Sequence, residues 1–324
     1  MIAGIHHVTA ICGDPQRNID FYAGVLGLRL VKRTVNFDDP QTYHLYYGDE
    51  VGWPGSLLTF FAWPDAARGV SGPGQIAETS LAVAPRSLGF WVERLLRHGV
   101  KFRGPELRRV GQIDERVLTF EDPDGLPLEL VASLASGEQA GWDGGGVPAE
   151  FAITGVHGVT LWENEGTATT SVLVDLLGLR QIDAHETTQR FVVPEHRPRS
   201  SVAVRTIGDF PKGNVSVGTV HHVAWRIGDL NGLNAAREQL VAGGLVPTPI
   251  VDRMYFQSVY FREPGGVLFE LATDEPGFEV DEPLGRLGEE LKLPPQYEPY
   301  RARIAATLPE IHAPGDVRDR YREQ

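Results

Sequence analysis

The segment FEDPDGLPLELV at residues 120–131 returns as FREPGGVLFELA at residues 261–272. Aligned without a gap, the two copies superimpose Phe120 on Phe261, Pro123 on Pro264, Gly125 on Gly266 and Glu129 on Glu270. The Pro-Asp-Gly and Pro-Gly-Gly tripeptides are typical of a tight turn, and the apolar run after each turn predicts a strand. The repeat therefore predicts that two parts of the chain close with the same turn and strand.

Upstream of each copy, a strand pattern is followed by an amphipathic helix pattern. These are ETSLAVA (78–84) with FWVERLLRHGV (90–100), and VHHVAWRI (220–227) with LNAAREQLVAGGLV (233–246). Two related units begin with IHHVTAIC (5–12) and VHGVTLW (156–162), and their helices close with LGLR. A glycine ends each predicted helix, as a left-handed C-terminal cap requires: Gly27, Gly99, Gly178, and Gly243 or Gly244. Each unit is therefore predicted to be a strand, a helix and three strands.

Four such units predict an α+β fold of four βαβββ modules, arranged as two paired-module domains. We expect the first domain at residues 1–135 and the second at residues 153–278. The glycine-rich residues 136–152 are the predicted linker. Residues 279–324 are left over, and we expect this tail to pack back as irregular chain plus a short helix.

Composition bounds the function. The chain has 324 residues, of which 42% are hydrophobic, and a formal net charge of −13, which argues against nucleic-acid or anionic-membrane partners. The N-terminus lacks the pattern of a secretory signal and no run of 18 apolar residues occurs, so we expect a soluble, cytoplasmic protein. The one cysteine, Cys12, is interpreted as a small buried hydrophobe. No nucleophile elbow, phosphate-binding loop or dinucleotide fingerprint is present, which disfavours hydrolases, kinases and dinucleotide-dependent enzymes.

The first strands of the units carry candidate metal ligands. His7 and His222 occupy equivalent places, each followed by V-x-x-x-x-G-D, and we place His157 and Glu78 at the same position of the third and second units. Glu270 stands in an apolar strand, where a carboxylate is costly without a partner. Two histidines and one carboxylate leave one face of an octahedral ion open, which suits Fe(II), although Zn(II), Mn(II) or Ni(II) could occupy the same ligands.

Other polar residues of these strands have open roles. Glu129 is interpreted either as a solvent-facing or salt-bridged strand residue or as a remnant of a second site. Neighbouring strand residues point to opposite faces, so in each doublet, His6-His7 and His221-His222, one member should bind metal and the other support it. Arg253, with Tyr255 or Tyr260, is expected to face the same cavity or to be exposed.

The chain resembles the vicinal oxygen chelate superfamily, and within it the ring-cleaving dioxygenases that act on hydroquinones. The resemblance covers nearly the whole chain and rests on residues 4–50, on VHHVAWR in the fourth unit and on LPPQYEP in the tail. It implies four βαβββ modules, Fe(II), and the ligands His7, His222 and Glu270. It also implies supporting or substrate-side places for His6, Thr9, His221, Arg253 and Tyr260.

A competing ligand set comes from the common extradiol catechol dioxygenases, which take all three ligands from the C-terminal pair of modules. Here that set would be His157, His222 and Glu270. We favour His7, because its HHVT context mirrors HHVA around His222, whereas Gly158 follows His157.

The expected function is an Fe(II)-dependent dioxygenase that inserts both oxygen atoms into a hydroquinone or catechol. Its partners would be a small aromatic substrate and dioxygen, with a homo-oligomer left open. The alternatives are a glyoxalase-like, metal-dependent lyase or isomerase, and a non-catalytic protein that binds quinones or other aromatic molecules.

Overall fold

The computed structural model describes residues 2–133, 141–194 and 200–312, and it contains the four expected modules. The first is β1 (Ile5–Cys12), α1 (Pro15–Ile19) continuing as the π-helix η1 (Asp20–Val25), β2 (Arg29–Asn36), β3 (Asp39–Gly48) and β4 (Leu57–Ala62). The second is β5 (Gln75–Val83), η2 (Pro85–Ser87), α2 (Leu88–Arg97), β6 (Phe102–Val110), β7 (Ile113–Glu121) and β8 (Pro127–Ser133).

The third module is β9 (Gly155–Glu163), α3 (Thr167–Ser171) continuing as the π-helix η4 (Val172–Leu176), β10 (Arg180–His185), β11 (Thr188–Val192) and β12 (Ser201–Thr206). The fourth is β13 (Val220–Arg226), α4 (Leu230–Ala242), β14 (Val251–Asp252), β15 (Gln257–Arg262) and β16 (Leu268–Ala272). The predicted terminal glycines have positive φ after all four helices; in the fourth module that residue is Gly244 (φ 83°), since Gly243 has a φ of −77°.

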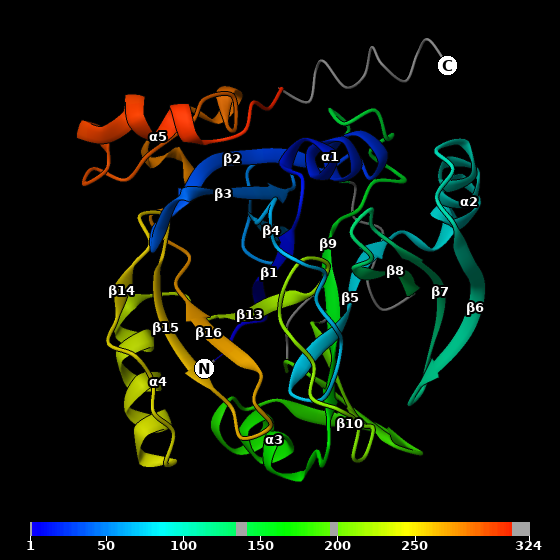
Figure 1. Cartoon of the computed structure of the whole chain (residues 1–324). Coiled ribbons are helices and arrows are strands. Elements are labelled where there is room, and N and C mark those ends of the chain that lie inside the picture. Colours follow the sequence, from blue (N-terminus) through cyan, green and yellow to red (C-terminus); the bar gives the residue numbers. More distant parts are fainter. Residues whose placement is uncertain (1, 134–140, 195–199, 313–324) are drawn as a thin grey trace.

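The strands form two eight-stranded sheets. The first has the order β14-β15-β16-β13-β1-β4-β3-β2, and the second has the order β10-β11-β12-β9-β5-β8-β7-β6 (Figure 1). The antiparallel pairs β1–β13 and β5–β9 join modules one to four and two to three. Each sheet therefore takes one module from residues 1–135 and one from residues 153–278, so sheet pairing does not follow the predicted halves.

The repeated closing segment forms the same turn twice and docks consecutive modules together. Asp122 accepts the backbone N–H groups two and four residues later, each at 2.8 Å, and Glu263 accepts the corresponding groups at 2.8 and 2.7 Å. The Tyr22 hydroxyl of module one donates to Asp122 at 3.0 Å, and Thr169 of module three donates to Glu263 at 2.6 Å. These turns therefore join module one to module two and module three to module four. The sheets join different pairs, module one to module four and module two to module three.

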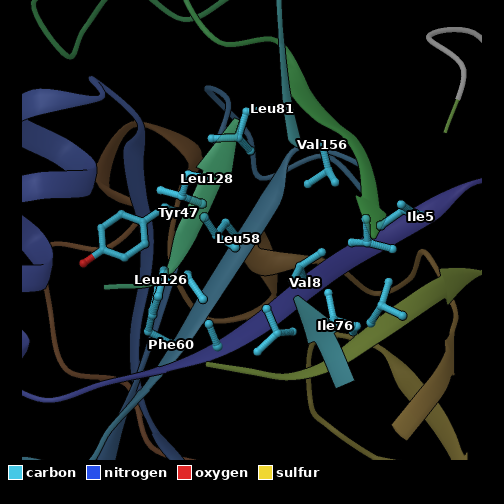
Figure 2. Close-up of a cluster of buried hydrophobic side chains, with 14 of the residues drawn as sticks. Ile5, Val8, Tyr47, Leu58, Phe60, Ile76, Leu81, Leu126, Leu128 and Val156 are labelled. Carbon is cyan, nitrogen blue, oxygen red and sulfur yellow. The ribbon is translucent and has the colours of Figure 1, made fainter. Parts of the chain in front are cut away.

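The main hydrophobic core lies between the two sheets. Figure 2 shows Val8, Leu58 and Phe60 of the first sheet beside Leu81 and Leu128 of the second. Cys12 belongs to this core as a free, buried thiol, as predicted, and burial raises its pKa. Because strand residues alternate between faces, the other face of β1 is free to line a site.

The described part of the tail packs on module one. It contains η5 (Phe278–Val280), η6 (Leu284–Arg286), η7 (Glu298–Tyr300) and α5 (Arg301–Thr307), and Figure 1 shows α5 beside β2 and β3. The fully buried Lys32 donates to Asp281 at 2.6 Å and also contacts Glu282. Residues 136–140 of the predicted linker and residues 313–324 of the predicted tail lie outside the described part. Among the described helices, none combines the length and apolarity needed to cross a membrane.

Candidate metal centre

Three buried ligand atoms converge at the middle of the first sheet. His7 Nε2 lies 3.2 Å from Glu270 Oε2, His222 Nε2 lies 2.9 Å from that same oxygen, and the two nitrogens are 3.3 Å apart. Two ligand atoms at right angles and about 2.1 Å from an octahedral ion would be about 3.0 Å apart. The spacing of this triad fits one ion bound on one face.

Cross-strand register explains the convergence. Tyr260 on β15 pairs with Glu270 on β16, Glu270 with Ala224 on β13, and Ala224 with His7 on β1. A second row, read in the opposite direction, runs His222, Thr9, Thr59 and Tyr46 across β13, β1, β4 and β3. The rows are related by an approximate two-fold axis, which places Thr59 where the other row has Glu270.

Both histidine doublets sit at β-bulges. On β1 the register shifts between Ile5 and His7, and on β13 it shifts between Val220 and His222, so His6 and His221 are the extra residues. An extra residue breaks the alternation of faces. The doublets therefore do not point apart as expected: His6 Nδ1 lies 2.9 Å from His7 Nδ1, and His221 Nδ1 lies 2.7 Å from His222 Nδ1.

The contacts of His6 orient His7 for metal binding. His6 Nε2 is 3.0 Å from the Thr273 carbonyl, which can only accept, so this nitrogen donates. Burial and the neighbouring His7 lower the pKa of His6 to about 3, so its Nδ1 is an acceptor at neutral pH. His7 must then donate from Nδ1, which leaves the lone pair of Nε2 facing Glu270.

The two carboxylate oxygens of Glu270 have different surroundings. The Ser258 hydroxyl donates to Oε1, while Oε2, fully buried, has no hydrogen-bond partner among the described residues. Burial alone would raise the pKa of Glu270, but its neighbours His7 and His222 outweigh burial and lower it well below its usual value. A buried, unpartnered carboxylate oxygen facing two imidazole nitrogens fits a divalent cation.

The triad opens into a cavity of about 360 Å³ with aromatic walls. Its lining includes the predicted His221, Arg253 and Tyr260, but not His6 or Thr9. Arg253 donates to the Tyr260 hydroxyl at 3.1 Å and to Asp38 at 3.0 Å. Burial and then Glu270 raise the pKa of Tyr260, so its phenol is protonated. The alternative residue Tyr255 donates to Asp281 of the tail and does not line this cavity.

The sequence interpretation missed several residues of this cavity. They are Asn36, Phe37, Asp38, His44, Tyr46, Phe61, Trp63, Phe256 and Leu268. His44 bonds to Tyr46 and to Thr59, each at 2.9 Å, and Thr59 bonds to Thr9 at 2.8 Å. Thr9 thus supports the cavity wall through Thr59 and His44. The available signal for His44 was its position in TYHLYY, a polar residue in an apolar strand.

His157 does not join the triad. Gly158 pairs with Ser80 as His7 pairs with Ala224, so Gly158 holds the position equivalent to His7, and our placement of His157 was wrong by one residue. His157 is the extra residue of a β-bulge, as His6 is on β1. His157 Nε2 instead bonds to Glu115 at 3.0 Å in the second sheet.

Glu129 is buried and salt-bridged, so the expectation that it faces solvent was wrong. Arg108 Nη1 lies 3.0 Å from each of its carboxylate oxygens, and Ser80 donates to it at 2.7 Å. Arg108 also donates to Glu115 at 3.1 Å. Glu78 lies nearby, and burial followed by the charge of Glu129 raises its pKa.

Known proteins resemble this chain over nearly its full length. MhqO of Bacillus subtilis (strain 168), provisionally named a ring-cleaving dioxygenase, is 43% identical over 94% of this chain and 95% of its own. Chlorohydroquinone/hydroquinone 1,2-dioxygenase of Sphingobium indicum is 34% identical over 95% and 96%. A crystal structure of a protein provisionally named a dioxygenase, from B. subtilis subsp. subtilis str. 168, superimposes with a TM-score of 0.89 at 41% identity, covering 96% of this chain and 98% of that one.

These relatives confirm the predicted enzyme class, a ring-cleaving dioxygenase. Residues 4–130 also match the model of the Glyoxalase/Bleomycin resistance protein/Dioxygenase superfamily. With two eight-stranded sheets built from four βαβββ modules and with these relatives, the chain belongs to that superfamily, among its ring-cleaving dioxygenases.

Proposed function

We propose that the protein is an Fe(II)-dependent dioxygenase that opens the ring of a hydroquinone-type or catechol-type aromatic and inserts both atoms of dioxygen. The observation that carries the proposal is the convergence of His7, His222 and Glu270 on one point at the wall of an aromatic-lined cavity. The name of the Sphingobium relative supports hydroquinones as the substrate class. We further propose a cytoplasmic location.

The two histidines and one glutamate support an Fe(II) site with open positions rather than a structural metal site in which protein ligands fill every position. Three protein ligands leave positions for substrate and dioxygen, and Thr59 stands where a second carboxylate would reduce that opening. Bound Fe(II) would supply a Lewis acid that lowers the pKa of a substrate hydroxyl and a redox centre that can bind dioxygen.

The protein's own residues would hold the ring at the triad. Phe61, Trp63 and Phe256 provide apolar surface, and the Tyr260 hydroxyl, which accepts from Arg253, retains its own proton to donate to a substrate oxygen. The two histidines next to the ligands in sequence differ in their exposure to the cavity. His221 lines the cavity and can reach a substrate, whereas His6 does not line it and orients His7. We propose these roles for Tyr260, His221 and His6.

Oxygen consumption tests the proposal. The protein is loaded with Fe(II) under anaerobic conditions, and uptake with hydroquinone is followed with an oxygen electrode. We expect one dioxygen per hydroquinone and, from ¹⁸O₂, an acyclic product that carries both labelled atoms. Iron-loaded protein that binds hydroquinone without uptake above autoxidation would overturn the proposal and favour sequestration, and turnover of a methylglyoxal–thiol adduct without uptake would favour a lyase.

A variant pair separates substrate handling from metal binding. His221→Ala should retain its iron and lose at least tenfold in kcat, because it removes a polar group at the cavity wall while the three ligands stay. Glu270→Ala should lose both iron and activity. Equal iron loss in the two variants would contradict the role proposed for His221.

A further inference from the structure

A second cavity of about 220 Å³ adjoins the one at the triad. Three side chains, Trp63, His221 and Leu268, line both cavities. Leu268 lies two residues before Glu270 on β16 and therefore on the same face, and His221 is bonded to the ligand His222. The second cavity thus begins one side chain away from the metal ligands.

Most of the side chains that line the second cavity are apolar: Ile76, Val215, Val220 and Val267, with the shared Trp63 and Leu268. Three polar side chains also line it, Gln75, His221 and Arg262. Gln75 Oε1 accepts from the Gly72 backbone at 3.0 Å, and one N–H group of Arg262 donates to the Gly266 carbonyl at 2.8 Å. Apolar atoms placed against the valines would displace water from apolar surface.

The surroundings of the triad cavity restrict where a ring substituent can go. The ion pair between Arg253 and Asp38 makes one border of that cavity charged. Past Trp63 and Leu268 most of the lining side chains are apolar, and Val215 at the second cavity is 37% exposed, so space continues to the surface. An apolar substituent has a favourable path in this direction.

We propose that the second cavity binds an apolar arm on the substrate ring, and that the preferred substrates are hydroquinones with an alkyl or aryl substituent of several carbon atoms. This inference rests on the proposed function, since it assumes that the ring lies at the triad. Each methylene buried from water is worth about fourfold in affinity, so a four-carbon arm should give at least tenfold tighter binding than hydroquinone.

Anaerobic binding of hydroquinones to the Fe(II)-loaded protein tests directly whether the second cavity binds the substituent. Calorimetry compares hydroquinone, butylhydroquinone and phenylhydroquinone, and we expect the substituted compounds to bind at least tenfold more tightly. Val215→Trp fills the second cavity without lining the first, so it should reduce that preference below threefold while leaving the Kd of hydroquinone unchanged. Equal binding of the three compounds to the wild type would overturn the proposal, as would an undiminished preference in Val215→Trp.

Val70→Trp is the matched control. Val70 is 62% exposed, its loop pairs with Asn214 beside Val215, and it lines neither cavity, so this variant should keep the full preference. If Val215→Trp does not fold, a crystal structure of the butylhydroquinone complex decides: an arm against Ile76 and Val215 supports the proposal, and an arm toward Asp38 contradicts it.

The two proposals can fail separately. Oxygen uptake with hydroquinone but no preference for the substituted compounds would retain the dioxygenase and remove the arm site. Tighter anaerobic binding of butylhydroquinone that Val215→Trp abolishes, without oxygen uptake, would retain the arm site and remove the dioxygenase.

Discussion

The centres of the two sheets have the same backbone plan and opposite chemistry. In each sheet an antiparallel pair of first strands has two bulges, at His6 and His221 in one and at Ala77 and His157 in the other. The first sheet gathers three ligand atoms around one point, with an unpartnered oxygen among them. In the second sheet, Arg108 instead bridges buried carboxylates and neutralises them.

The register shows what changed at each ligand position. Glu78 pairs with Thr160 as His222 pairs with Thr9, and Glu129 pairs with Ser80 as Glu270 pairs with Ala224. Gly158 pairs with Ser80 as His7 pairs with Ala224, and a Cβ at Gly158 would lie 2.4 Å from the Ser201 carbonyl oxygen. The second sheet therefore has donors at two of the three ligand positions and no room for a histidine at the third.

The difference suggests how function and stability are divided within one fold. Converging donors without a cation are costly, so the first sheet is built for a ligand, whereas paired charges in the second sheet satisfy one another. Variants at corresponding places can test this division.

The largest contrast should be in metal content. Glu270→Ala removes the anionic ligand and should weaken metal binding more than a hundredfold, since even outer partners of a ligand are worth 10–100-fold. Glu129→Ala, at the matching place of the repeat, should retain about one metal ion per chain. Elemental analysis after dialysis measures both, and a full metal complement in Glu270→Ala would remove Glu270 from the site.

Removal of the Arg108 guanidinium, which bridges Glu115 and Glu129, should affect stability alone. Arg108→Met leaves Glu115 and Glu129 buried without their cation and should lower the free energy of unfolding by about 3–5 kcal/mol. Metal content should not change. Arg109→Met is the control, because Arg109 is 75% exposed and its pair with Asp114 should be worth less than about 1 kcal/mol. Urea unfolding compares them, and equal losses would show that the network contributes little.

A smaller effect should appear in the pH dependence of stability. Burial would raise the pKa of Glu115, but hydrogen bonds and charges of His157 and Arg108 outweigh burial and lower it from 4.5 to about 2. The resulting stability is present above pH 4.5 and is lost as the pH falls toward 2, a contribution of about 3 kcal/mol. Glu115→Gln should therefore lose less stability than wild type between pH 6 and 3. Parallel curves for the two proteins would contradict this assignment.

The repeats in the sequence predicted the modules, because spacing along a strand is preserved in space, and the family resemblance selected the three converging residues from the candidates that the repeats offered. Two features could not be obtained in this way. A bulge adds one residue without a sequence signal of its own, which is why the doublets were expected to point apart and His157 was placed one residue away from its true equivalent. His44 and Trp63 reach the cavity only through the order of strands in the sheet, which local pattern does not determine.

The pairing of module one with module four also has a consequence for how the protein is made. During synthesis β1 emerges long before β13 and β16, and at about 5–20 residues per second the delay between β4 and β16 is on the order of 10–40 s. The edge of β1 that will pair with β13 lacks its partner in this interval, whereas β5 to β12 can complete the other sheet. We therefore expect nascent chains to be most prone to aggregation through β1, and prompt release of residues 220–272 to limit that risk.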